Sequence, residues 1–304
     1  MASRPRPLSF LAWLPQAALI GLARALPYRA RLAFASGFAR ALVALVPDLR
    51  RRVEGNLRLV FPAMPAPERR RIRSAMADSF GRTMIEVMTR RAFQARHAWT
   101  GPSGPGWDAL LAARAEGRGA LLVSGHFGQW EAVRASLLAH GIESGAMIRP
   151  VKNPFLNADY LANVEAGGQP VIGRDGAGIR ELVRHLRRGG VMSILIDQYT
   201  KRGAPIDFLG HPAPSGTAIA ELAIKYGLPM IPVYGTRQPD GLHVVVEFEA
   251  PIPSGTALEM TQAAADSLAA RVRAHPGQYY WLHRRWVKTF DPNPAGPADR
   301  TSRD

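Results

Sequence analysis

The stretch from Gly119 to Leu138, GALLVSGHFGQWEAVRASLL, decides how this chain folds. Its opening run, Ala120–Val123, is short, apolar and bounded by glycines, which predicts a buried strand. From Gln129 onward, apolar residues recur at the spacing of an amphipathic helix. A polar turn that contains His126 and Glu131 therefore joins a predicted strand to a predicted helix.

The two polar residues of that turn suggest acid–base chemistry. Loops at the carboxyl ends of strands in open α/β sheets commonly bind ligands, and Glu131 falls in the first turn of the helix. A carboxylate that accepts a hydrogen bond from one imidazole nitrogen fixes the tautomer and raises the basicity of the other nitrogen. We therefore expect Glu131 to fold back onto His126, which then removes a proton from a hydroxyl. From spacing alone, a structural histidine is an equal alternative.

Composition limits the classes of protein that fit. The 304 residues are enough for one large α/β domain or two smaller ones. With 39 basic and 24 acidic residues, the formal net charge is +15, which indicates an anionic partner, either nucleic acid or a membrane surface. The absence of cysteine excludes disulfides and thiolate metal sites.

The N-terminal region is expected to contact a membrane. Leu8–Leu26 is mostly apolar but is interrupted by Pro15, Gln16 and Arg24, whereas a spanning helix needs roughly 20 apolar residues in succession. Aromatic and cationic residues among aliphatic ones favour an interfacial helix, with a spanning or a buried packing helix as alternatives. We accordingly assign residues 1–30 to membrane association, 31–290 to the main domain and 291–304 to a tail.

Strands and helices alternate after residue 119, which predicts a mainly parallel central sheet flanked by helices. A helical, basic region precedes it, with expected helices at Arg31–Val46 and Pro67–Arg91. The remaining expected strands are Ala146–Ile148, Gln169–Ile172, Val191–Ile196, Met230–Tyr234, His243–Phe248 and a tail strand near Tyr279–Leu282; the remaining expected helices are Asn153–Val164, Ala177–Arg188, Thr217–Tyr226 and Thr261–His275.

Two further polar groups follow predicted strand ends. Arg149, Lys152 and Asn153 form a cationic group suited to a phosphate, including that of an acyl carrier's phosphopantetheine, unless they are ordinary surface residues. Asp197 and Gln198 follow a strongly apolar strand, so Asp197 is either functional or a cap of the next turn.

Near the C-terminus, Arg284 and Arg285 lie between Trp281 and Trp286. Interleaved cations and aromatic rings suit phosphate contact and stacking, on either nucleic acid or lipid headgroups. The chain has no His-Glu-x-x-His zinc motif, no Walker glycine loop and no Gly-x-Ser-x-Gly elbow. We therefore expect no metal and no cofactor.

The segment GHFGQWE (residues 125–131) resembles the His-x-x-x-x-Asp/Glu block of the glycerolipid and lysophospholipid acyltransferase superfamily, and most closely its bacterial lipid A late acyltransferases. The resemblance runs from about Arg50 to Lys288, with six blocks in family order. They are Asn56-Leu57 with Phe61-Pro62, residues 125–131, Arg149–Pro154, Gly189-Gly190 with Ile196–Gln198, Phe208–Ala213 and Tyr279–Trp286.

This resemblance implies that a fatty acyl group moves from acyl carrier protein to a hydroxyl of a lipid A precursor, at the cytoplasmic face of the inner membrane. It implies His126 as general base with Glu131 as its partner, Arg149 and Asp197 shaping the site, and no nucleic acid as partner. One departure is Glu165, near a place where the family usually has an arginine, so another lipid acceptor such as a lyso-lipid stays open. An esterase or thioesterase and a nucleic-acid-binding protein are the other classes.

Overall fold

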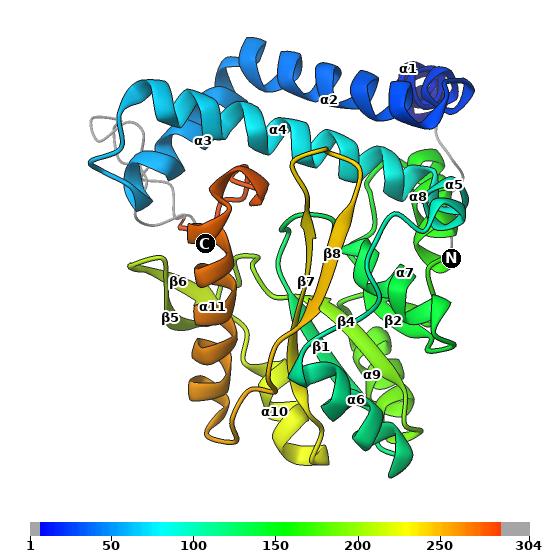
Figure 1. Cartoon of the computed structure of the whole chain (residues 1–304), viewed down its shortest axis with the longest axis vertical. Helices are drawn as coiled ribbons and strands as arrows, with labels where there is room; N and C mark the ends of the chain where they lie inside the picture. Colours follow the sequence, from blue (N-terminus) through cyan, green and yellow to red (C-terminus); the bar gives the residue numbers. More distant parts are fainter. Residues whose placement is uncertain (1–6, 287–304) are drawn as a thin grey trace, which may run out of the picture.

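The computed structural model describes residues 7–286 and shows an α/β fold built on a six-stranded sheet with the order β3-β2-β4-β1-β7-β8 (Figure 1). Five strands run parallel and β8 pairs antiparallel to β7. The predicted fold class is confirmed. The strands are β1 (Ala120–Ser124), β2 (Ser144–Met147), β3 (Val171–Ile172), β4 (Val191–Leu195), β7 (Met230–Arg237) and β8 (Val244–Phe248).

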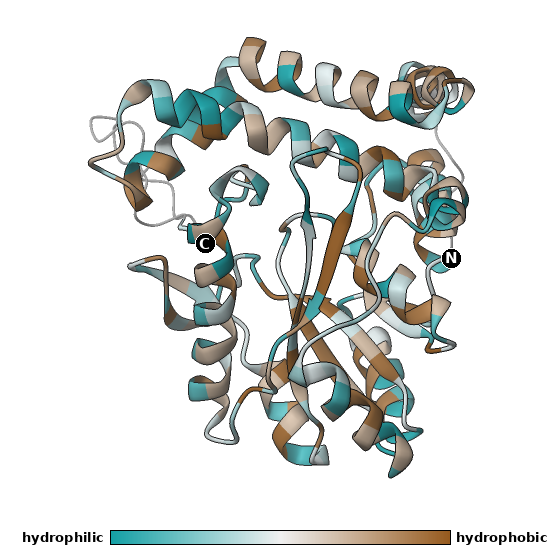
Figure 2. Ribbon diagram, viewed as in Figure 1, coloured by the Kyte–Doolittle hydropathy of each residue, from teal (hydrophilic) through white to brown (hydrophobic). Residues whose placement is uncertain are grey.

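Helices cover both faces of the sheet because successive side chains of each strand point to opposite faces. On one face, residues such as Leu122 and Val233 pack against α5 (Arg90–Arg96), α6 (Pro105–Ala115) and α7 (Glu131–Ala139). On the other face, Leu121 and Ile194 pack against α9 (Gly176–Arg187), α10 (Ala218–Tyr226) and α11 (Ala257–Ala274). Figure 2 shows this apolar character concentrated in the strands.

A helical layer formed by α1 (Pro7–Ala25), α2 (Tyr28–Leu45), α3 (Pro47–Val60) and α4 (Ala66–Met88) lies across one end of the sheet (Figure 1). Between Ser9 and Ala25, Ala12 aside, only Ala23 is fully buried, so α1 is not a buried packing helix. No single described helix is long and apolar enough to cross a membrane, although α2 and α3, bent by 86°, together reach the required length and apolarity. Helix α8 (Pro154–Glu165) packs against α1.

Two sequence-based expectations about secondary structure are wrong. The expected strands included none between Val191–Ile196 and Met230–Tyr234, but β5 (Ala204–Phe208) and β6 (His211–Ser215) form an antiparallel hairpin there. The expected strand at Tyr279–Leu282 does not form. Its only bridge pairs Tyr279 with Phe127, after a short 3-10 turn at Pro276–Gln278. Residues 1–6 and the predicted tail at 291–304 lie outside the described residues.

Candidate active site

Strand register places His126 beside Asp197. Strands β1 and β4 are parallel neighbours in which Ser124 pairs with Leu195. Each polar residue lies two positions beyond that pair, so both emerge at the carboxyl edge of the sheet. His126 Nδ1 and Asp197 Oδ1 are 2.8 Å apart, and the His126 backbone N–H donates to Asp197 Oδ2 at 2.9 Å.

The loop that carries His126 is held by its backbone. Gly128 has φ 55°, and a Cβ there would lie 2.1 Å from the carbonyl oxygen of Gly235, so only glycine fits this turn. Gly128 N–H donates to Gln278 O at 3.0 Å, and the backbone N–H of Gln129 donates to Gly235 O at 2.8 Å. These contacts fix the position of the histidine relative to β7.

The Asp197 carboxylate stays ionised beside the imidazole. Its side chain is fully buried, which alone raises the pKa of a carboxyl, but the His126 ring and, to a lesser degree, the His283 ring outweigh this effect and lower the pKa below its usual value. An anionic Asp197 requires Nδ1 of His126 to carry the proton and to donate it. The Nε2 lone pair is then free, and no residue between 7 and 286 hydrogen-bonds to it.

A second histidine, His283, completes a cluster around the same carboxylate. Its ring centroid is 4.5 Å from that of His126, and its Nε2 lies 3.7 Å from Asp197 Oδ2. Burial lowers the pKa of His283 to about 4, against the opposing attraction of Asp197. His283 is therefore neutral near pH 7. His126 is then the histidine that hydrogen-bonds to the charged carboxylate of Asp197.

Glu131 does not contact the imidazole, and the expected hydrogen bond between them is corrected. Its buried carboxylate accepts hydrogen bonds from Arg90 Nη1 at 2.7 Å and Arg134 Nη1 at 2.9 Å. Burial raises the pKa of Glu131, but Arg134 and Arg90 outweigh it and lower the pKa overall. Glu131 is the first residue of α7. From this position its side chain points toward α5 and away from the imidazole ring of His126.

The two arginines tie together distant segments. Arg134 also donates to the carbonyl oxygens of Ser144, Val164 and Gly168, at the start of β2 and the end of α8. Both arginines are almost fully buried, and burial lowers the pKa of Arg90 to about 10. Glu131 thus provides the counter-charge for Arg90 and Arg134, which connect the segments that surround the site.

A cavity of about 160 Å³ adjoins His126. Glu131, Arg149 and Gln198, all predicted from the sequence, line it together with His126, and Arg174 is a lining residue that the sequence reasoning missed. Burial and the nearby Arg149 lower the pKa of Arg174. Within residues 7–286 neither of these two arginines forms a hydrogen bond or ion pair, so both are available to an anion.

The other predicted residues do not join this cavity. Lys152 is exposed, whereas Asn153 caps α8 by accepting from Phe155 N–H and Leu156 N–H. Arg284 is exposed. Arg285 is buried and donates to Pro214 O at 2.9 Å, so the expectation that it meets a headgroup is corrected: it fastens the β5–β6 hairpin.

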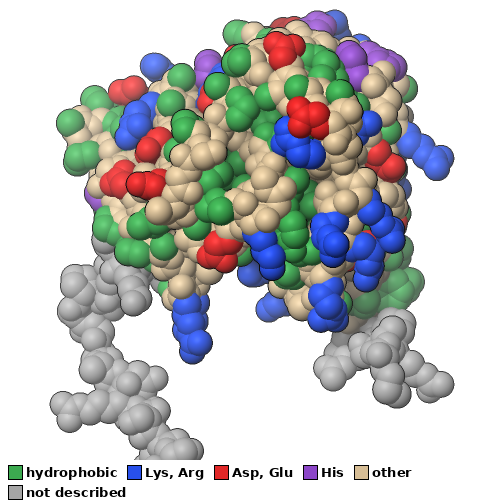
Figure 3. Space-filling model, turned by 90° about the horizontal axis from the view of Figure 1, so that it is seen from below, with side chains coloured by type: hydrophobic (Ala, Val, Ile, Leu, Met, Phe, Trp, Pro, Cys, Tyr) green, Lys and Arg blue, Asp and Glu red, His purple; other side chains and the backbone are tan. Residues whose placement is uncertain are grey.

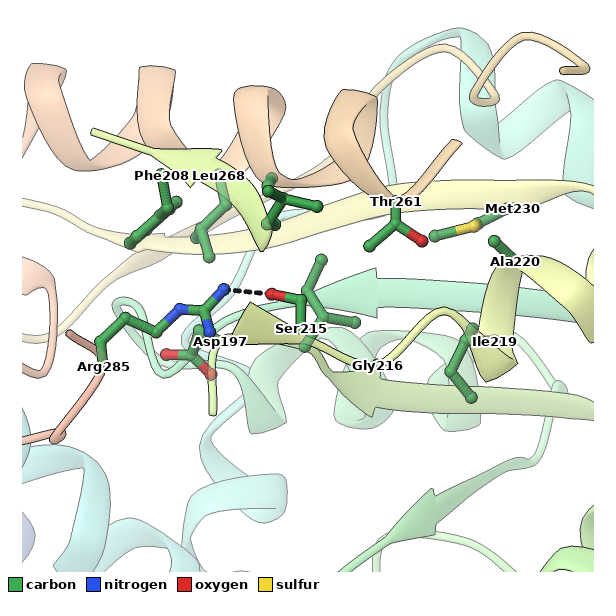
Figure 4. A pocket seen from close by; sticks show the side chains of 13 residues that line it. Asp197, Phe208, Ser215, Gly216, Ile219, Ala220, Met230, Thr261, Leu268 and Arg285 are labelled. Atoms are coloured by element: carbon green, nitrogen blue, oxygen red, sulfur yellow. Dashed lines mark hydrogen bonds between the residues drawn. The ribbon is translucent and has the colours of Figure 1, made fainter. Parts of the chain in front are cut away.

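A smaller cavity of about 20 Å³ lies behind Asp197, under the hairpin. Figure 4 shows Arg285 hydrogen-bonded to Ser215 beside Asp197, with apolar side chains such as Leu268 and Met230 around the remaining wall. This volume holds about one water molecule. Of these two cavities, the one in front of His126 is therefore the candidate substrate cavity.

Among the described residues, one cluster meets the distance requirement for a metal ion. His126, Asp197 and His283 each offer a ligand atom, all within 4.8 Å of one another. In the structure His126 Nδ1 and Asp197 are hydrogen-bonded to each other. The expectation that the protein needs no metal stays a prediction.

Sequence signals existed for some of the residues that were missed. His283 lies inside the block Tyr279–Trp286, directly before the two arginines that were predicted to bind a headgroup. Arg174 follows the predicted strand that ends at Ile172, as Arg149 follows the one before it. Arg90, by contrast, belongs to a basic helical region with no local feature that marks it.

Comparisons with known proteins find matches to acyltransferases. A family model described as "Bacterial lipid A biosynthesis acyltransferase" matches residues 3–288. A phosphatidylinositol mannoside acyltransferase of Mycobacterium tuberculosis is 27% identical over 186 residues, which span 60% of this chain and 59% of the relative. A lipid A biosynthesis lauroyltransferase of Escherichia coli strain K12 is 26% identical, and the match spans 97% of this chain and 95% of the relative.

Proposed function

The chain belongs to the bacterial lipid A biosynthesis acyltransferase family, and on that premise we propose that it transfers a fatty acyl group from an acyl carrier protein thioester to a hydroxyl of a lipid A precursor, with His126 as general base. The observation that carries the proposal is the hydrogen bond from His126 Nδ1 to the buried Asp197, which leaves Nε2 of a ring that lines the cavity free to act as a base.

In this mechanism His126 Nε2 removes the proton of the acceptor hydroxyl as its oxygen attacks the thioester carbonyl. Asp197 stabilises the imidazolium that forms. The tetrahedral intermediate then collapses, the carbon–sulfur bond breaks, and the imidazolium returns its proton to the departing thiolate. The products are a lipid ester and the free thiol of the carrier, and no acyl-enzyme is formed.

Unpaired cations at the cavity suit the donor. Arg149 and Arg174 line the cavity beside His126 and form no hydrogen bond or ion pair with a described residue, although Asp197 attracts Arg174 electrostatically. A phosphopantetheine phosphate there gains charge-assisted hydrogen bonds. The net charge of +15 favours docking of an acidic carrier protein. Figure 3 shows Lys and Arg side chains grouped on the face seen from below, among acidic and apolar ones.

Membrane association is part of the proposal. Among the side chains whose burial the structure describes, twelve large hydrophobic ones are exposed, and seven of these belong to α1 and α2. They are Phe10, Leu11, Leu14, Leu22, Phe38, Leu42 and Leu45. Apolar side chains concentrated in this way favour contact with a bilayer. We place these helices at the cytoplasmic face of the inner membrane, where acyl carrier protein and lipid substrates meet.

The test is a transfer assay with the wild type and His126→Ala. Radiolabelled lauroyl acyl carrier protein is offered with a lipid A precursor, a lyso-phospholipid or a phosphatidylinositol mannoside in vesicles. Loss of the base is expected to lower the rate roughly 100- to 10,000-fold while the variant stays folded and vesicle-bound.

The acceptors separate the alternatives. Transfer only to the lyso-phospholipid or the mannoside refutes the lipid A precursor as acceptor and keeps the mechanism. Free fatty acid released at the same rate with and without acceptor identifies an esterase instead. A His126→Ala variant as active as the wild type contradicts the role of His126.

A further inference from the structure

An apolar groove of about 400 Å³ lies between α1, α2 and α4 and has no lining residue in common with the cavity at His126. We call it the N-terminal groove, and its walls include Leu19, Phe38, Leu42, Phe80, Met84 and Tyr280. Gln16 is the one side chain with a polar group among the described residues that line it, apart from the hydroxyl of Tyr280. A hollow of this composition suits a hydrocarbon chain.

The inner end of the groove lies one aromatic ring away from the catalytic histidine. Tyr280 stacks on Phe80 with ring centroids 4.3 Å apart, and its centroid is 6.1 Å from that of His126. The backbone N–H of Tyr280 donates to the His126 carbonyl oxygen at 3.0 Å. A molecule in the groove thus has one end separated from the His126 ring by the ring of Tyr280.

The outer side of the groove opens onto the exposed apolar surface of α1 and α2. Phe38 and Leu42 line the groove and are 47% and 43% exposed, while Leu45, outside it on the same helix, is 78% exposed. These side chains gain from contact with lipid tails. A chain can therefore enter from a bilayer against α1 and α2 without crossing water.

We propose that the N-terminal groove binds one hydrocarbon chain of the acceptor lipid, an inference that rests on the proposed function of His126. The acceptor is anchored in the bilayer, on the side where the groove opens. The donor chain arrives on a water-soluble carrier, and the arginine-lined cavity offers it both a phosphate site and buried apolar walls at Leu122, Val133 and Val233. Two hollows that approach His126 separately match the two substrates of a transfer reaction.

The test is photo-crosslinking of the full-length protein with an acceptor-like probe. The probe is palmitoyl lysophosphatidylglycerol with a diazirine in the distal third of its chain, in vesicles of phosphatidylethanolamine and phosphatidylglycerol. Labelled peptides are mapped by mass spectrometry. Crosslinking needs no turnover, so a protein that fails the transfer assay still reports on the groove, and the two proposals can fail separately.

Leu42→Asp and Leu45→Asp are a matched pair, since each replaces an exposed leucine of α2 with the same charge and only Leu42 lines the groove. We expect labels on α2 and α4 in the wild type and Leu45→Asp, and at least fivefold less labelling in Leu42→Asp. Met84→Trp, which narrows the groove, is expected to act like Leu42→Asp.

Two outcomes overturn the inference. One is equal labelling of Leu42→Asp and Leu45→Asp on the outer faces of α1 and α2, which indicates membrane contact without a bound chain. The other is labelling of the groove by a diazirine-bearing palmitoyl thioester of acyl carrier protein, which assigns the groove to the donor.

Discussion

The two fixed residues of one short motif, His126 and Glu131, belong to two different regions of the site. His126 pairs with Asp197, which follows the neighbouring strand, and the His126 side chain lines the cavity. Glu131 pairs with Arg90 and Arg134 in a buried cluster that joins α5, α7, α8 and β2. The first pair is arranged to move a proton, whereas the second neutralises charge inside the wall. Proximity in sequence therefore does not identify the carboxylate that acts on a histidine.

Asp197→Asn tests the first region and has the largest expected effect. The amide cannot stabilise the imidazolium and allows the wrong tautomer, so we expect kcat to fall about 100- to 10,000-fold. Thermal stability is expected to change far less than activity. A variant that keeps wild-type kcat shows that Asp197 only supports the loop.

Glu131→Gln tests the second region. It leaves Arg90 and Arg134 buried without a counter-charge, which is expected to cost about 3–5 kcal/mol in the free energy of unfolding, measured by urea denaturation. Glu116→Gln is the control, because Glu116 and Arg118 form an exposed pair whose loss is expected to cost about 1 kcal/mol or less. Equal effects of the two substitutions contradict the assigned role of the buried cluster.

His283→Gln tests the first region through the pH dependence of folding stability. The pKa of His283 is about 4 in the folded chain against an ordinary value of 6.5, so the unfolded chain binds more protons between these pH values. Folding stability therefore falls as the pH drops from about 6.5 to about 4, by up to about 3 kcal/mol. Urea denaturation across this range is expected to show that the free energy of unfolding falls less steeply with decreasing pH in His283→Gln than in the wild type. An equally steep fall in both proteins refutes the lowered pKa of His283.

Arg174→Gln has the smallest expected effect. Loss of a charge-assisted contact to phosphate is expected to raise KM for acyl carrier protein thioesters about 10-fold. With an N-acetylcysteamine thioester, which has no phosphate, KM is expected to stay the same. Arg180→Gln, an exposed arginine on α9, controls for the change in net charge.

The local features of the site followed from the sequence, and those that depend on strand order did not. An apolar run, a glycine-rich turn and an amphipathic run predicted where His126 lies. Strand β4 is one of the two neighbours of β1, although β2 and β3 come between them in the chain, so the pairing of His126 with Asp197 depends on sheet topology.

Other misses also have physical reasons. Arg90 reaches Glu131 across 41 residues, which no local pattern reveals. The hairpin was not predicted because the segment contains Pro205, Pro212 and Pro214. Proline lacks an N–H group and is disfavoured in interior strands. A two-stranded sheet has only edge strands, so it accommodates them.

The tautomer of His126, measured by ¹⁵N NMR of histidine-labelled protein, tests most directly which carboxylate orients this residue. The account predicts a ring protonated at Nδ1 in the wild type and in Glu131→Gln, and loss of that preference in Asp197→Asn. A tautomer that survives in Asp197→Asn and is lost in folded Glu131→Gln would contradict the account.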